Sequence, residues 1–197
     1  MDEIAFGYAE KLNAAVDAPY PPVKVEKENP LYATAILDNM GGKVSESTLL
    51  SAYLYHHLTL KKYEDVALIC RKIETVENHH LHIMGELTVA LGGEPRLWSI
   101  SGEKMMTYWS AGYHKYPTLL EEALLLLIQE EKKTIDKYSR QANGIKDNGV
   151  VANLLRVIED ERLHLEMLEG LFKLYYPNGE ADMVARREYT LGNFSLE

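Results

Sequence analysis

Two short stretches of the chain pair a glutamate with a histidine three positions later, Glu77 with His80 and Glu161 with His164. On an α-helix, residues three positions apart share one face, with Cβ atoms about 5–6 Å apart, so each pair could bind one metal ion. A single pair of this kind is a weak signal because it often arises by chance. Its recurrence in the second half of the chain makes metal-ion chemistry the first hypothesis for this protein.

The repeat extends beyond these pairs. Glu46 lies 31 residues before the first glutamate and Glu131 lies 30 residues before the second, and each is followed seven residues later by a tyrosine, Tyr53 and Tyr138. Seven residues are close to two helical turns, so each tyrosine is expected on the face of its glutamate. The chain therefore contains a doubled unit of glutamate, tyrosine and Glu-x-x-His.

The choice between two adjacent glutamates depends on which helix face is apolar. Glu131 shares its face with leucines and an isoleucine, whereas Glu130 shares its face with lysines. Because the apolar face of an amphipathic helix points inward, we expect Glu131 to be buried and Glu130 to be solvated. The same test places Glu77 and Glu161 at core-facing positions.

Buried carboxylates repel one another, so four of them must be protonated or paired with cations. No lysine or arginine shares the helix faces that carry these glutamates. Two divalent metal ions would supply about four positive charges and neutralise the cluster, as in carboxylate-bridged four-helix proteins. A purely structural polar core without metal is the alternative.

Apolar residues at helical spacing predict the elements that must position these groups. Four long helices are expected at 45–60, 63–91, 118–142 and 150–176, with Thr118 as the N-cap of the third. Short turns join them in two pairs, and a crossover at 92–117 joins the pairs. No alternating strand pattern is apparent. The prediction is an all-α four-helix bundle with a long crossover between the second and third helices.

The domain boundaries follow from proline and glycine positions. Residues 1–28 are expected to form an N-terminal arm, because PYPPV forbids regular helix. The bundle is assigned to residues 29–178, including a short helix at 31–40 that ends at the glycines 41 and 42. Residues 179–197 are assigned to a C-terminal tail.

Composition narrows the class of protein. The length of 197 residues and an apolar content of 46% suit one globular domain. The net charge of −9 argues against nucleic acid or a membrane as partner. The single cysteine, Cys70, excludes a disulfide framework and a CxxC zinc site, and it fits a reducing compartment. Because the N-terminus lacks the features of a signal peptide, we expect a cytoplasmic protein.

Several segments resemble a known superfamily. The stretches NPLYATAILDNMGGKVSESTLLSAYLYHH and ENHHLHIMGE are similar to manganese catalases of the spore-coat type, and ERLHLEML resembles the metal-binding domain of rubrerythrins. Over residues 29–176 the pattern resembles the ferritin-like superfamily of dinuclear carboxylate proteins. The resemblance implies a ferritin-like bundle that holds two iron or two manganese ions per chain. It implies as metal ligands Glu46, Glu77, His80, Glu131, Glu161 and His164, with Glu77 and Glu161 bridging the two ions.

Other residues near the predicted site have two interpretations. Tyr53 and Tyr138 are either ordinary core tyrosines or donors of a hydroxyl hydrogen bond to a carboxylate of the opposite half. His57 lies near the face of Glu46 and is either a core histidine or a seventh ligand. His79 and His82 lie off the face of Glu77 and are expected at the surface or at an interface.

Two redox-active ions bridged by carboxylates suit two-electron chemistry on peroxide or oxygen. We predict an oxidoreductase acting on hydrogen peroxide, of catalase type with manganese or of peroxidase type with iron, because the donor set suits both metals. The chain lacks the paired CxxC motifs of a rubredoxin module, so a peroxidase would need an external electron donor. The alternatives are a non-catalytic iron-binding, ferroxidase or oxygen-responsive protein and a metal-free structural bundle. We expect a homodimer or a larger homo-oligomer.

Overall fold

The computed structural model describes residues 7, 9–100 and 106–178. The predicted C-terminal tail at 179–197 lies outside the described residues. Within the predicted N-terminal arm, residues 9–11 are helical and residues 12–29 have no regular secondary structure.

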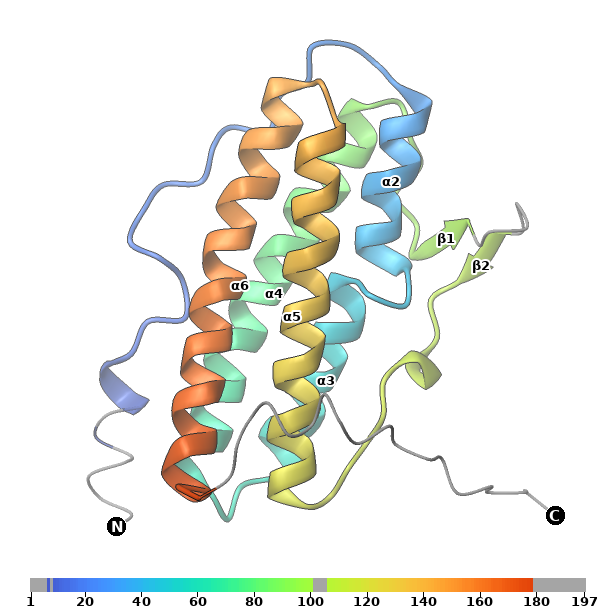
Figure 1. The fold of residues 1–197 in the computed structure, drawn as a ribbon. Coiled ribbons are helices and arrows are strands. Elements are labelled where there is room, and N and C mark those ends of the chain that lie inside the picture. The colour runs from blue at the N-terminus through green and yellow to red at the C-terminus, as the bar shows by residue number, and fades with distance from the viewer. Residues whose placement is uncertain (1–6, 8, 101–105, 179–197) are drawn as a thin grey trace, which may run out of the picture.

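Two antiparallel helical hairpins form the bundle (Figure 1). The first hairpin is α3 (Glu46–Thr59) with α4 (Glu64–Ala90), and the second is α5 (Leu120–Gly144) with α6 (Asn148–Tyr175). A long segment crosses from the end of α4 to the start of α5. The predicted all-α bundle with a crossover between its second and third helices is therefore confirmed. None of the described helices is long and apolar enough to cross a lipid bilayer.

A short helix precedes α3, as predicted for residues 31–40, and a break at residues 42–45 separates the two helices. The helix α2 (Pro30–Gly41) packs along α4 beyond the start of α3, so α2 and α3 together run beside α4 (Figure 1). The helix ends at Gly41, as predicted. A Cβ atom on Gly41 would lie 2.4 Å from the backbone nitrogen of Trp98, so only glycine fits where the crossover packs against α2.

The break determines where Glu46 lies. Ser45 is the N-cap of α3, and its hydroxyl accepts a hydrogen bond from the backbone N–H of Thr48. Glu46 is consequently the first residue of α3. The positive end of the helix dipole stabilises a carboxylate at this position.

The crossover contains secondary structure that the sequence pattern did not predict. Strand β1 (Trp98–Ile100) pairs antiparallel with β2 (Met106–Tyr108), with Trp98 opposite Tyr108. A 3-10 turn, η1 (Ala111–Tyr113), follows. Strands of three residues are too short to show an alternating pattern. The predicted capping of α5 by Thr118 is wrong, because the N-cap is Leu119 and the helix begins at the buried Leu120.

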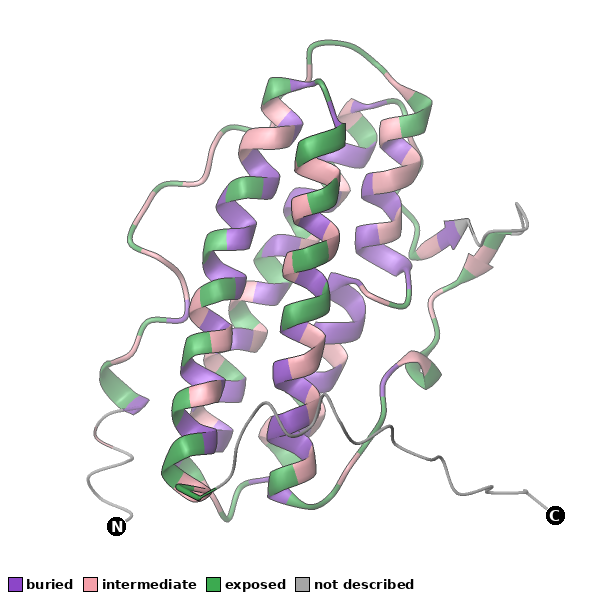
Figure 2. Ribbon diagram, in the orientation of Figure 1, coloured by how far each residue is buried: buried purple, intermediate pink, exposed green. Residues whose placement is uncertain are grey.

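The apolar core consists of two clusters along the bundle, whose buried residues face inward (Figure 2). On α4, Ile73 belongs to one cluster and Ile83 to the other. On α5, Ile128 and Tyr138 are divided in the same way. The predicted ligands of these helices lie in the intervals between the two clusters. The polar site is therefore a layer between two apolar regions, which isolate it from solvent.

Candidate metal centre

The structure brings all six predicted ligands together from the four helices. They form two groups whose possible ligand atoms lie within 4.8 Å of one another. We call the first group the His80 site and the second the His164 site. The His80 site contains Glu46, Glu77, His80 and Glu161. The His164 site contains Glu77, Glu131, Glu161 and His164. Every member is fully buried, and the two groups share Glu77 and Glu161.

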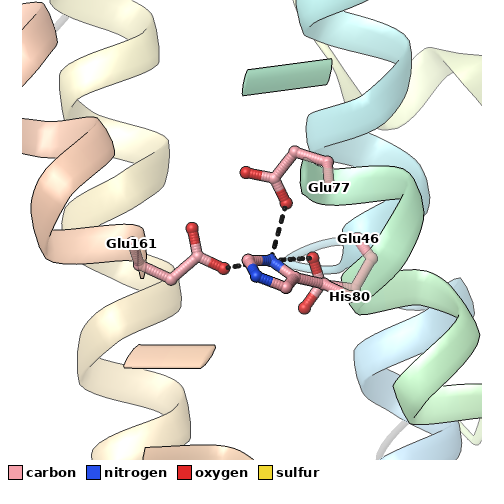
Figure 3. Close-up of side chains that lie close together, drawn as sticks. All are labelled: Glu46, Glu77, His80 and Glu161. Atoms are coloured by element: carbon pink, nitrogen blue, oxygen red, sulfur yellow. Dashed lines mark ion pairs between the residues drawn. The ribbon is translucent and has the colours of Figure 1, made fainter. Parts of the chain in front are cut away.

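In the His80 site, the imidazole directs Nδ1 toward three carboxylates (Figure 3). The atom lies 3.5 Å from Oε2 of Glu77 and 3.3 Å from Oε1 of Glu161. Oε2 of Glu46, from the first turn of α3, lies 3.8 Å away. One nitrogen and three carboxylates thus converge on one point, which is a donor set of the type that binds manganese or iron.

The His164 site repeats this arrangement with the other oxygen of each shared glutamate. Nδ1 of His164 lies 3.1 Å from Oε1 of Glu77 and 3.1 Å from Oε2 of Glu161. Oε1 of Glu131 lies 3.7 Å away. Each shared carboxylate therefore directs one oxygen to each site, as a carboxylate that bridges two metal ions does.

Unpartnered polar atoms support the same interpretation. Within the described part of the chain, both carboxylate oxygens of Glu77 and Nδ1 of His80 are buried without a hydrogen-bond partner. The same is true of Oε2 of Glu46, Oε2 of Glu131 and Oε1 of Glu161. Buried polar atoms are nearly always partnered in native proteins, and an unpartnered one is destabilising. Coordination of two metal ions would satisfy these atoms together, so the residues present fit the group.

The pKa values of several glutamates and of both histidines in the cluster are shifted because several ionisable groups are buried close together. Burial, reinforced by the neighbouring glutamates, raises the pKa of Glu46 and Glu131 well above the usual range. Burial acts in the same direction on Glu161, but hydrogen bonds with both histidines outweigh it and hold its pKa far below the usual range. Burial lowers the pKa of each histidine, whereas carboxylate hydrogen bonds raise it, to about 9 for His164 and well above 6.5 for His80. Metal binding must therefore displace a proton from each imidazole.

Two tyrosines hold the glutamates that belong to one site only. The hydroxyl of Tyr138 donates to Oε1 of Glu46 at 2.5 Å, and the hydroxyl of Tyr53 donates to Oε1 of Glu131. Each tyrosine comes from the opposite half of the chain, as the second of the two interpretations requires. The other oxygen of each carboxylate, Oε2, is buried without a hydrogen-bond partner among the described residues.

The outer nitrogens of both histidines have partners that the sequence pattern did not reveal. Nε2 of His80 lies 3.1 Å from Oδ2 of Asp160, and Nε2 of His164 lies 2.9 Å from the carbonyl oxygen of Ala14. Asp160 adjoins a predicted ligand, but it lay outside the doubled unit. A carbonyl partner leaves no side-chain signal in the sequence.

The remaining histidines near the predicted site are not part of it. Nδ1 of the half-buried His57 lies 3.0 Å from the carbonyl oxygen of Ala67, so His57 is not a seventh member of the cluster. His79 and His82 are exposed, as predicted. Cys70 is fully buried, and burial raises the pKa of its thiol to about 12.

A second pair of buried histidines lies outside the cluster. The rings of His56 on α3 and His114 after η1 meet edge to face at 5.6 Å between centroids. Their ring nitrogens have no hydrogen-bond partner among the described residues. Burial lowers the pKa of each histidine from 6.5 to about 4, so both are neutral at pH 7.

This pair should make the metal-free protein sensitive to acid. Because the pKa of both histidines is lower in the folded than in the unfolded chain, the unfolded chain binds protons first as the pH falls. The stabilisation is fully present above pH 6.5 and is lost as the pH falls to about 4. The upper limit is about 3 kcal/mol for each histidine, at about 1.4 kcal/mol per pKa unit. Urea denaturation of the metal-free protein at several pH values measures the loss.

The variant His114→Gln, which cannot be protonated, isolates this contribution. Its free energy of unfolding should fall less steeply between pH 6.5 and 4 than that of the wild-type protein. The exposed His82→Gln variant is the matched control and should keep the wild-type slope. Equal slopes for all three proteins would contradict the assignment.

Comparisons with known proteins agree with this geometry. A sequence model of the Rubrerythrin family matches residues 44–172, which include the whole cluster. Two similar solved structures are of KatB, a manganese catalase from Anabaena. One has a TM-score of 0.71 at 17% sequence identity, and the other, of the wild-type protein, has a TM-score of 0.69 at 18%. Both comparisons cover 92% of this chain and 85% of the KatB chain, and they show a shared fold. Among curated protein sequences, none matches the chain significantly.

Proposed function

The chain belongs to the rubrerythrin family, and on that premise we propose that it is a dinuclear metal oxidoreductase that consumes hydrogen peroxide. One observation carries the proposal. Glu77 and Glu161 each direct one oxygen to the His80 site and the other to the His164 site. This arrangement suits two ions that share two carboxylates. Two redox-active ions at these positions would exchange two electrons with peroxide.

The protein's own residues fix the geometry and the polarity of the site. Tyr53 and Tyr138 each donate a hydrogen bond to one oxygen of Glu131 and of Glu46, and the second oxygen of each carboxylate has no hydrogen-bond partner among the described residues. The apolar clusters on either side exclude bulk water, which strengthens every charge interaction within the site. A substrate as small as peroxide is compatible with so enclosed a position.

Dismutation, the catalase reaction, is the preferred route. In this reaction one peroxide is oxidised to oxygen and another is reduced to water, so no external donor is needed. The sequence offers a single cysteine, which is buried with a raised pKa, and so provides no cysteine-ligated electron relay. The fold similarity to a manganese catalase supports manganese as the metal for this route.

The test compares the metal-free protein reloaded with manganese or with iron. Peroxide loss and oxygen release are followed for each form with and without an added reductant. Manganese-loaded protein should turn over without reductant and release one oxygen for every two peroxides. Glu131→Gln should lose this activity, whereas the adjacent Glu130→Gln, whose carboxylate pairs with Lys133 outside the cluster, should retain it.

Other outcomes discriminate among the alternatives. Peroxide loss that depends on reductant and releases no oxygen would indicate a peroxidase. A single stoichiometric burst with either metal would contradict the enzyme proposal. The non-catalytic iron-binding or oxygen-responsive protein would then take its place.

A further inference from the structure

The N-terminal arm is fastened to the bundle on both sides of the metal centre. At one side, Nζ of Lys72 donates to the carbonyl oxygens of Ala9, Glu10 and Leu12 at 2.7–2.8 Å. At the other side, the backbone N–H of Glu26 donates to the Asp147 carboxylate at 2.7 Å. The segment between them runs beside α6 (Figure 1). The arm is therefore held along the helix that carries two of the predicted ligands.

The arm contacts His164 directly. The carbonyl oxygen of Ala14 lies 2.9 Å from Nε2 of His164. A carbonyl oxygen can only accept a hydrogen bond, so Nε2 must carry the proton. When the imidazole is neutral, its lone pair is consequently on Nδ1, the atom that faces Glu77 and Glu161. The arm thus sets the tautomer that can bind a metal.

The arm contacts His80 through Asp160. Oδ2 of Asp160 accepts hydrogen bonds from the Tyr20 hydroxyl at 2.5 Å and from Nε2 of His80 at 3.1 Å. Oδ1 of Asp160 accepts from the backbone N–H of Val16 at 2.7 Å. Two arm residues therefore orient the carboxylate that in turn orients His80.

Arg156 joins these contacts into one unit. Its guanidinium pairs with Asp160 at 2.6 Å, and it also donates to the carbonyl oxygens of Val16 and Ala18. The guanidinium carbon lies 4.2 Å from the centroid of the Tyr20 ring. Because residues 12–29 have no regular secondary structure, these bonds replace the backbone partners that a helix or a strand would supply.

We propose that the N-terminal arm is a positioning element of the metal centre, in which Ala14 fixes the imidazole of His164 and Tyr20, acting through Asp160, fixes that of His80. The inference rests on the proposed function only in assuming that the cluster binds two metal ions. It adds that each site depends on a different part of the arm. A substitution that loosens one part of the arm should weaken metal binding at one site and leave metal binding at the other site unchanged.

Two full-length variants separate the two contacts. Tyr20→Phe removes the hydroxyl that holds Asp160 and keeps the ring that packs against Arg156. Lys72→Met releases the carbonyls of residues 9, 10 and 12, next to Ala14. Tyr175→Phe is the matched control, because it also removes a tyrosine–aspartate bond, to Asp65 at 2.6 Å, away from the cluster.

Zinc is the probe, because it is diamagnetic and binds imidazole and carboxylate ligands. Side-chain nitrogen NMR follows Nδ1 of His80 and His164 during zinc titration, with assignments from the two His→Ala variants. In Tyr20→Phe the affinity at His80 should fall about 10–100-fold while that at His164 is retained. In Lys72→Met the zinc affinity at His164 should fall while that at His80 is retained. In the zinc-bound wild-type protein, Nε2 of both histidines should carry the proton.

The outcome that overturns the inference is unchanged zinc affinity in Tyr20→Phe and Lys72→Met relative to Tyr175→Phe. An equal weakening of both sites that parallels a lower melting temperature of the zinc-free variants would also overturn it, because that pattern indicates a general structural role. Wild-type protein that binds two metal ions and consumes no peroxide would refute the proposed function alone.

Discussion

Replacing His80 by alanine should abolish peroxide consumption and reduce the bound metal from two ions to one per chain. His80 is the only imidazole of its site, and it lies within 4 Å of the three carboxylates that would share the ion. Its loss removes one ligand from the coordination sphere. His164→Ala should have the same effect on the other site. Elemental analysis and a peroxide assay on the purified variants measure both effects.

Two further variants provide a control and an intermediate effect for comparison with His80→Ala. His82→Ala removes an exposed histidine two positions away on the same helix and should leave metal content and activity unchanged. Tyr53→Phe keeps every ligand and removes only the hydroxyl that holds Glu131, so it should lower metal affinity about 10–100-fold without abolishing binding. A His80→Ala protein that keeps two tightly bound ions and normal turnover would contradict the assignment of the ligands.

Removal of the metal should lower the melting temperature markedly. Without metal, the four buried glutamates retain unpartnered oxygens and mutual repulsion. An ion present at about 1,000 times its dissociation constant stabilises the folded state by about 4 kcal/mol. For a chain of this size, that corresponds to about 8–16 °C in melting temperature. Calorimetry before and after chelation, and again after metal is restored, measures the difference.

The variant Glu77→Gln tests the physical cause of this effect. It removes one of the two shared carboxylates, so it should bind metal more weakly than the wild-type protein. It also removes one negative charge from the cluster, so its metal-free form should be at least as stable as that of the wild type. If chelation left the wild-type melting temperature unchanged, the cluster would be a structural polar core balanced by protons.

Helical spacing and the internal repeat were enough to identify the six residues that cluster in the structure. Helical periodicity is local, so residues three and seven positions apart can be placed on one face without knowledge of the fold. The same reasoning distinguished Glu131, which is fully buried, from Glu130, which is half-buried and paired with Lys133. The doubled unit placed each tyrosine on the face of its own glutamate and left two interpretations open, a core tyrosine or a hydroxyl donor to the opposite half; the structure has the second arrangement.

The groups that surround the cluster could not be predicted from helical spacing, because they come from segments that are distant along the chain. The close approach of the Trp98 backbone to Gly41 brings the crossover against α2, and the bond between Ala14 and His164 joins residues 150 positions apart. Asp160 became recognisable as a partner of His80 only when α4 and α6 were placed side by side. These features depend on contacts between distant segments, and one of them involves a backbone carbonyl that every residue possesses. Periodicity therefore identifies which side chains face the core, whereas packing decides which distant groups hold them in place.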